Sequence, residues 1–168
     1  MKAFVPRIIK LPDRKVISVT SHGDPNKVME PYMKALYGAA YGAKMGVYKP
    51  KGIKMELGKL AARWPDAHLK PKDEWTGIWG VAVPDYVTQK DLLQKDPKIK
   101  ATIETWKGGD CAEVLYIGPY ADEGPTIKNL HRFVEDSGYK LVGQHEEEYL
   151  SRPGAGAKTI IRNLIEKK

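Results

Sequence analysis

Residues 15–26 read KVISVTSHGDPN, and they place a strand, a turn and the start of a helix in direct succession. The β-branched, alternating first half favours a strand. Asp24 followed by Pro25 is typical of a helix N-cap with proline at the first helical position, where no backbone donor is lost. Apolar residues then recur at three- and four-residue intervals as far as Tyr41, and Gly46 is the expected stop. We therefore predict an amphipathic helix directly after the strand.

Two further strands are expected after this helix. Scattered apolar residues over 54–63 favour an extended segment, although a short helix fits them about equally well. Residues 75–83 carry no charge on either face, which is typical of a central strand covered on both sides. Pro84 ends this strand because proline cannot donate to the ladder. A short surface helix is predicted over 87–95, with Thr88 as its cap.

The same order of elements recurs in the second half of the chain. The predicted elements are strands at 104–107 and 111–117 joined by a hairpin turn at 108–110, a helix beginning near Pro125, and strands at 139–149 and 158–165. Two strand–helix–strand–strand halves, about 15–85 and 101–165, predict an α+β fold of one domain over 1–168. We expect an antiparallel sheet with the helices on one face and a ligand groove between the repeats.

The composition narrows the classes of function. The net charge is +7, but the lysines are scattered among acids, so we expect no direct binding to nucleic acid. No apolar run approaches the length of a membrane span, and the N-terminus does not resemble a signal peptide. One cysteine excludes an internal disulfide, and the histidines lack metal-ligand spacing. A cytoplasmic protein without a metal or cofactor is the expectation.

Residues 145–150, HEEEYL, place three consecutive carboxylates in a predicted strand, although strands usually avoid glutamate. Because side chains alternate between the two faces of a strand, Glu147 shares a face with Tyr149, and Glu146 shares the other face with Glu148. A solvated edge strand, charged against edge-to-edge pairing, explains Glu146 and Glu148. We expect a separate role for Glu147.

Five aromatic residues are predicted to lie in or beside the strands: Trp75, Trp79, Tyr116, Tyr120 and Tyr149. Aromatic residues in strands mostly belong to the core, and any one of these five is explained in that way. Together with Glu147 they would form an aromatic groove with one carboxylate, which suits flat, lipophilic or cationic ligands. Desolvation among the rings would disfavour the charged carboxylate and move it toward general acid–base catalysis.

Several blocks of the sequence carry a family resemblance. They are 23–26 with Tyr32, Ala35, Leu36 and Tyr37; 84–88; 111–120, ending YIGPY; Leu130-His131 with Gly138-Tyr139; and 145–150 with Ser151 and Pro153. Taken together and in this order, they resemble the gyrase-inhibitor-like (GyrI-like) small-molecule-binding family over nearly the whole chain. Two positions depart from the usual pattern: Tyr116 stands where histidine is common, and Gly77 stands where a second tryptophan is expected.

The resemblance implies a tandem strand–helix–strand–strand (SHS2) fold with a ligand groove between the repeats. The same module is the drug-sensing half of some multidrug-responsive transcription regulators, in which a buried glutamate contacts cationic aromatic ligands; Glu147 matches it. Stand-alone members are similar to hydrolases that open the cyclopropane of DNA-alkylating compounds. On that basis Glu147 would position water and Trp75 or Trp79 would stack on the electrophile, while Tyr116, Tyr120 and Tyr149 would contact the ligand.

Three functions remain open at this point. The first is binding with hydrolysis of flat, electrophilic xenobiotics, as in a cyclopropanoid hydrolase. The second is non-catalytic binding or sequestration of cationic aromatic compounds. The third is a protein-interaction module, for which the resemblance suggests DNA gyrase as the partner. We expect no helix-turn-helix DNA-binding domain, because the two repeats occupy the chain.

Overall fold

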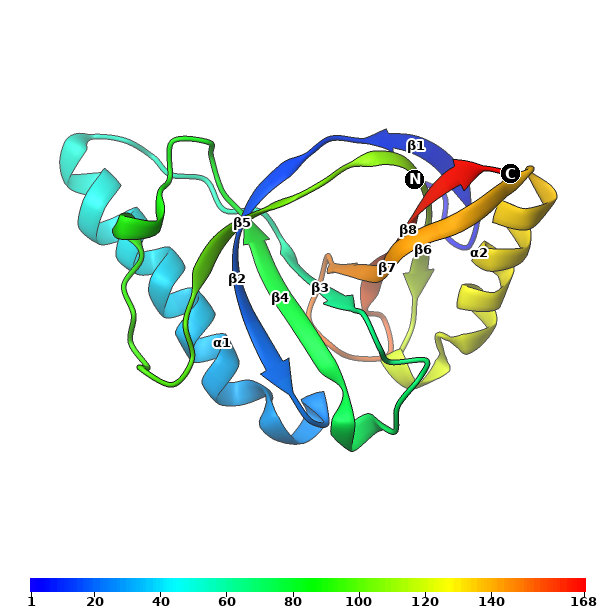
Figure 1. The fold of residues 1–168 in the computed structure, drawn as a ribbon, viewed down its shortest axis with the longest axis horizontal. Coiled ribbons are helices and arrows are strands. Elements are labelled where there is room, and N and C mark those ends of the chain that lie inside the picture. Colours follow the sequence, from blue (N-terminus) through cyan, green and yellow to red (C-terminus); the bar gives the residue numbers. More distant parts are fainter. The chain divides into compact units, whose positions relative to one another are not determined.

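The computed structural model describes residues 1–168, which divide into two compact units. Unit 1 comprises Met1–Asp13 and Lys107–Lys168, and unit 2 comprises Arg14–Trp106. Each unit contains antiparallel strands and one α-helix of more than three turns, so the predicted α+β class is confirmed (Figure 1). No helix is both long and apolar enough to span a membrane.

Unit 2 holds the first strand–helix–strand–strand sequence. Its elements are β2 (Arg14–His22), α1 (Pro25–Tyr41), β3 (Leu60–Trp64), β4 (Thr76–Ala82) and β5 (Thr102–Trp106). The strands are ordered β3-β4-β2-β5, all antiparallel neighbours. Figure 1 shows α1 running alongside β2. The uncharged strand β4 lies between two partners, as its sequence predicts.

The start of α1 agrees with the sequence and its end does not. The Asp24 carboxylate accepts a hydrogen bond from the Asn26 N–H at 2.9 Å, and Pro25 occupies the first turn. The helical path continues beyond α1 through a π-helical turn over Gly42–Tyr48 and a 3-10 turn over Lys49–Lys51. The chain leaves the helical path at Gly52, whose φ of 73° is a left-handed conformation that glycine adopts without strain. The expected stop at Gly46 is therefore wrong.

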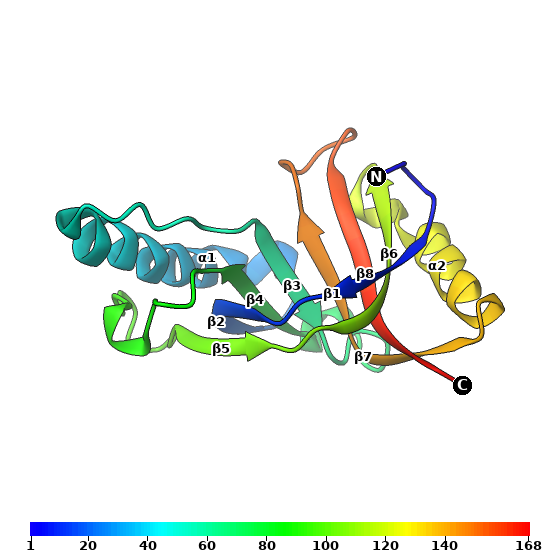
Figure 2. The same cartoon turned by 90° about the horizontal axis from the view of Figure 1, so that it is seen from above.

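Unit 1 holds the second strand–helix–strand–strand sequence together with an N-terminal strand. Its elements are β1 (Arg7–Leu11), β6 (Gly109–Ile117), α2 (Gly124–Asp136), β7 (Tyr139–Tyr149) and β8 (Lys158–Lys167). The strands are ordered β1-β6-β8-β7. Leu130 and Val134 of α2 form one apolar core with Val114 of β6 and Ile161 of β8. Figure 2 shows α2 and the strands of this unit from a second direction.

The predicted hairpin at 108–110 is wrong. Strand β5 pairs with β2 in unit 2, whereas β6 pairs with β1 and β8 in unit 1, so the chain passes from one unit to the other between these strands. A side chain at Gly108 would collide with the backbone of Leu11, and the Asp13 carboxylate accepts a hydrogen bond from the Gly108 N–H at 2.7 Å. A close backbone approach, and not a hairpin turn, therefore explains Gly108.

Three local predictions also differ from the structure. Only residues 60–64 of the extended segment expected over 54–63 form a strand. The surface helix expected over 87–95 is a single 3-10 turn over Gln89–Asp91, although Thr88 and Asp91 form the capping interactions that its sequence indicates. Strand β1 was not predicted, since the proline-flanked segment that contains it is short and mostly exposed.

Candidate functional site

Glu147 lies on the face of the unit 1 sheet that α2 covers. It pairs directly with Ile161 of β8, and Ile161 belongs to the core beneath α2. Directly opposed residues on antiparallel strands point to the same face of a sheet, so Glu147 points to the helix side. Tyr149, two residues along the strand, pairs with Thr159 and shares this face, as its sequence position predicts.

Two side chains of the same strand hold the Glu147 carboxylate. The Nε2 atom of His145 lies 2.7 Å from Oε2 of Glu147, and the Tyr149 hydroxyl donates to Oε1 at 3.4 Å. The Glu147 side chain is only 9% exposed, against 23% for His145. No lysine or arginine forms an ion pair with Glu147, so the imidazole is its cationic partner when protonated.

A second carboxyl, that of Glu123, approaches Glu147 from the start of α2. Glu123 precedes the helix but forms no side-chain capping bond to it. Burial, the negative charge of Glu147 and a hydrogen bond with Glu147 raise the pKa of Glu123 to about 9. Ionising both of two neighbouring, poorly solvated carboxyls has a high free-energy cost, because the two negative charges repel each other. The pair therefore holds one proton at neutral pH.

Two buried polar atoms on this side of unit 1 have no hydrogen-bond partner within the protein. They are Oε2 of Glu123 and the hydroxyl of Thr159. Glu123 is 8% exposed and Thr159 is fully buried. Thr159 pairs with Tyr149 on one side and Tyr116 on the other, which places it in the row of residues next to that of Glu147. Unpaired buried polar groups are rare in proteins, and such a group is satisfied by a bound water, an ion or a ligand or has a catalytic role.

Two tyrosine rings complete this arrangement, which we call the acidic cluster: Glu123, His145, Glu147, Tyr120 and Tyr149. The rings of Tyr120 and Tyr149 meet edge to face, with centroids 5.6 Å apart. Burial and the negative charges of Glu147 and Glu123 raise the pKa of the Tyr120 hydroxyl. Tyr120 is nevertheless 38% exposed, so the cluster reaches the protein surface at this ring.

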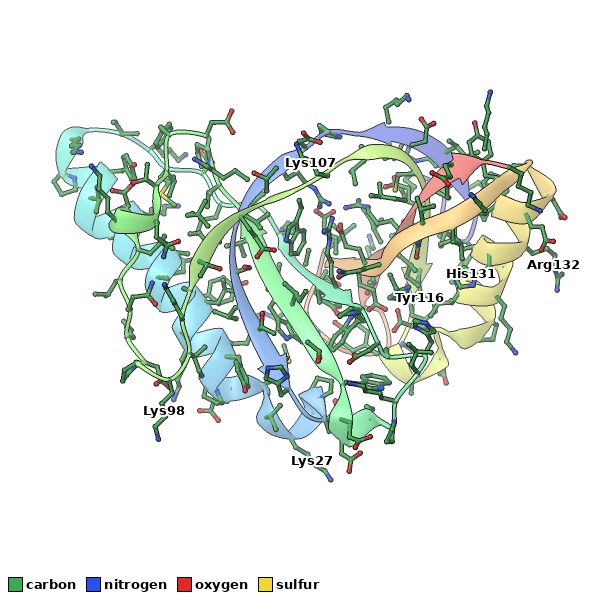
Figure 3. All side chains as sticks on the ribbon, in the orientation of Figure 1. Lys27, Lys98, Lys107, Tyr116, His131 and Arg132 are labelled. Carbon is green, nitrogen blue, oxygen red and sulfur yellow. The ribbon has the colours of Figure 1, made fainter.

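Tyr116, a predicted ligand contact, lies in an environment typical of the core. It is 4% exposed, belongs to the core beneath α2 and donates its hydroxyl to the Pro119 carbonyl at 2.5 Å. Figure 3 labels Tyr116 on the strands of unit 1, with His131 and Arg132 at successive positions of α2. Partial burial and the charge of His145 lower the pKa of His131, which places this second imidazole near the acidic cluster.

The two predicted tryptophans lie in unit 2 and differ in exposure. Trp79 is 3% exposed and donates its indole N–H to the buried Ser21 hydroxyl at 2.9 Å, an environment typical of the core. Trp75 is partly exposed, and its N–H bonds the Lys70 carbonyl at 3.0 Å. The pairing of either tryptophan with Glu147, like the groove between the repeats, stays a prediction.

Trp64 explains the departure at Gly77. A Cβ at Gly77 would lie 2.9 Å from the Trp64 ring, 2.9 Å from the Trp79 indole nitrogen and 2.8 Å from the Ser21 hydroxyl. Trp64 also contacts both predicted tryptophans, with ring centroids 5.1 Å from Trp79 and 5.8 Å from Trp75. No side chain fits at Gly77, because the third tryptophan of this group comes from β3. The sequence did not single out Trp64.

The expectation of a solvated edge charge is wrong for Glu146. Its side chain is 3% exposed and accepts a hydrogen bond from Nη1 of Arg162 at 3.1 Å. Nη2 of Arg162 bonds Glu113 at 3.1 Å and lies 3.6 Å from Glu148. Arg162 itself is buried, and although burial disfavours its charge, these three carboxylates keep its pKa above the ordinary value. Glu146 therefore has a structural ion pair on the face opposite Glu147.

Glu123 and His145 were missed as site residues for different reasons. The acidic residue before Pro125 is typical of a helix start, and no sequence pattern shows that its carboxyl turns to a distant strand instead. His145 has the same parity as Glu147, which is a signal that the strand pattern offered.

No group of three or more His, Cys, Asp or Glu side chains is arranged to hold a metal ion.

Solved structures with the same fold cover nearly the whole chain. An uncharacterised conserved protein from Listeria innocua is 24% identical, with a TM-score of 0.84 over 98% of this chain and 93% of that one. A Listeria innocua protein described as a hydrolase is 22% identical, with a TM-score of 0.82 over 99% and 94%. SAV2435 bound to tetraphenylphosphonium is 10% identical, with a TM-score of 0.53 over 96% and 94%.

The comparisons by sequence give one family. A search of curated proteins finds no match. The model of the GyrI-like small molecule binding domain matches residues 4–162, which includes all of unit 2, all of unit 1 except its two ends, and every residue of the acidic cluster. The chain therefore belongs to the GyrI-like small-molecule-binding family.

Proposed function

We propose that the protein binds flat, lipophilic or cationic aromatic small molecules at the acidic cluster. The observation that carries this proposal is the Glu147 carboxylate, which is nearly buried, has no lysine or arginine partner and lies beside the rings of Tyr120 and Tyr149. A desolvated carboxylate next to aromatic rings attracts an organic cation by charge and by the ring quadrupole. A cytoplasmic location is part of the proposal.

Tetraphenylphosphonium is a suitable first probe, because SAV2435, a protein with the same fold, has been solved with this cation bound. We expect calorimetry to detect binding to the wild-type protein and a loss of about 10- to 100-fold in affinity in Glu147→Gln, since a charge-assisted contact contributes about 1.5–3 kcal/mol. Glu166→Gln is the matched control, because this carboxylate on β8 is exposed and its ion-pair partner is Lys140. Equal affinities in wild type and Glu147→Gln would contradict the proposal.

Hydrolysis of electrophilic, cyclopropane-bearing compounds is the second candidate. It is favoured by the 2.7 Å contact between His145 and Glu147, which is a suitable base for water, and by the protonated carboxyl of Glu123 next to it. Water oxygen would bond to the cyclopropane methylene while the ring C–C bond breaks, and the electron pair of that bond passes into a conjugated cyclohexadienone, whose carbonyl oxygen becomes a phenolate. The proton lost by water goes to the Glu147–His145 pair, and the phenolate takes up a proton from the Glu123 carboxyl or from solvent. Trp75, the more exposed of the two predicted tryptophans, would stack on the electrophile.

Mass spectrometry separates binding from hydrolysis. A compound that carries an activated cyclopropane is incubated with the protein, and hydrolysis adds the mass of one water to it. We expect this product to be lost in Glu147→Gln and reduced in Trp75→Ala. Binding without product leaves the first proposal intact and rejects the second. No observation favours DNA gyrase as a partner, so gyrase is not part of the proposal.

A further inference from the structure

The acidic cluster contains more carboxyl groups than a simple cation site needs. The carboxyls of Glu123 and Glu147 are close enough to interact, although they come from the start of α2 and from β7. Oε2 of Glu123 is buried without a hydrogen-bond partner, and no basic side chain contributes to the pKa of Glu123. A carboxyl in these surroundings keeps its proton until a positive charge arrives to compensate the second negative charge.

We propose that binding of an organic cation expels the proton shared by Glu123 and Glu147, so that the affinity for cations rises with pH while the affinity for neutral analogues does not. The inference rests on the proposed function and adds a rule for selectivity to it. A neutral ligand leaves the carboxyl pair protonated, whereas a cation is met by two carboxylates. The protein would therefore distinguish ligands by charge as well as by shape.

The charged and titratable groups around Glu123 are consistent with the exchange of a proton for a bound cation. Its charged or titratable neighbours are Tyr116 on β6, Tyr120 and Asp122 before α2, Glu147 with His145 and Tyr149 on β7, and, next to His145, His131 on α2. No lysine or arginine contributes to the raised pKa of Glu123, whose causes are burial and Glu147. Partial burial and the charge of His145 lower the pKa of His131, so a bound cation would be the main charge that compensates the second carboxylate.

The test measures tetraphenylphosphonium binding by calorimetry between pH 6 and pH 8.5. In the wild type, we expect Kd to fall by up to about tenfold per pH unit, with about one proton released per cation bound at pH 7.5, as measured in buffers of different ionisation enthalpy. Glu123→Gln keeps a neutral group of the same shape and should bind with a Kd that changes little over this range. Triphenylphosphine oxide, a neutral analogue, should show no proton release.

His145 provides the control for a different proton source. His145→Gln places an amide that can donate a hydrogen bond near Glu147 but cannot titrate, so the pH dependence above pH 7.5 should persist in this variant. If the dependence disappears in His145→Gln and persists in Glu123→Gln, the proton comes from the imidazole and the inference is overturned.

The proton of Glu123 is also measurable without a ligand. Carbon-13 NMR of the glutamate carboxyls, assigned with Glu123→Gln, should show one resonance that titrates far above the ordinary glutamate range. A Glu123 carboxyl that ionises together with the exposed glutamates overturns the inference whatever the ligand does. Binding of tetraphenylphosphonium with no pH dependence overturns the inference alone, while no binding at any pH overturns the proposed function and the inference with it.

Discussion

At the scale of single residues, Glu123 and Glu147 show how neighbours assign different roles to the same side chain. The Glu147 carboxyl lies 2.7 Å from Nε2 of His145 and accepts a hydrogen bond from the Tyr149 hydroxyl. Glu123 has an unpartnered oxygen and faces the Glu147 charge, so it keeps a proton. The cluster therefore combines one carboxylate with one carboxylic acid.

This arrangement predicts that Glu123 lowers stability as the pH rises. Its pKa is near 4.5 in the unfolded chain and about 9 in the folded protein, so over this interval the folded state binds more protons than the unfolded state. Glu123 therefore favours folding fully below pH 4.5, and this contribution is lost as the pH rises toward 9. Allowing for solvent screening, we expect a loss on the order of 1–3 kcal/mol between pH 5 and pH 8.

Chemical denaturation at several pH values measures this effect. Glu123→Gln should be more stable than wild type at pH 8 and close to it near pH 5. Glu135→Gln is the control, since Glu135 is an exposed residue of the same helix with a long ion pair to Lys168. Parallel pH profiles for wild type and Glu123→Gln would show that Glu123 has an ordinary pKa in the folded protein.

At the scale of elements, one row of charges crosses all four strands of unit 1. Arg7 pairs with Glu113, Glu113 with Arg162, and Arg162 with Glu146, and these register partners also form the ion pairs. Opposite charges directly across neighbouring strands stabilise a sheet and specify its register. The face beneath α2 is apolar around its centre, so the two faces of this sheet have different chemistry.

Replacement of Arg162 should lower the free energy of unfolding, because it leaves buried carboxylates without their main cation. We expect Arg162→Met to lose about 3–5 kcal/mol of unfolding free energy at pH 7. Arg7→Met is the control: its side chain is 50% exposed, so about 1 kcal/mol is expected. Similar losses in the two variants would contradict a central role for Arg162.

At the scale of the whole molecule, the two units are connected by the chain at two places, next to Asp13 and next to Lys107. Gly108 lies beside the second passage and against the backbone that leads to the first. Lys107 and Gly108 both bond the Asp13 side chain, so the two passages are tied together within unit 1.

Gly108→Ala should therefore destabilise the fold, because the added methyl group would collide with the Leu11 backbone rather than with a movable side chain. We expect a loss of about 2–4 kcal/mol, measured by chemical denaturation. Gly46→Ala is the matched control: nothing lies within 4 Å of the added atom and the residue is helical, so no loss is expected. Equal unfolding free energies of the two variants would show that the backbone near Leu11 accommodates the added methyl group without a loss of stability.

Local patterns predicted much of this fold. The capped start of α1, the uncharged central strand β4, the order of elements in both halves and the shared face of Glu147 and Tyr149 all depend on short-range periodicity and capping chemistry, which are properties of neighbouring residues. The family is likewise carried by short blocks along the chain. These features depend on neighbouring residues and not on contacts between distant parts of the chain.

Other features depend on contacts between residues far apart in the chain. The Gly108-Gly109 pair predicts a hairpin, but the strands on its two sides pair with other strands. The sequence of β7 predicts a solvated charge at Glu146, but the fold brings Arg162 into a hydrogen bond with it. Glu123 belongs to the acidic cluster only because α2 begins next to β7. Sequence periodicity sets which way a side chain points from its own strand, whereas burial and pairing depend on what the fold brings to meet it.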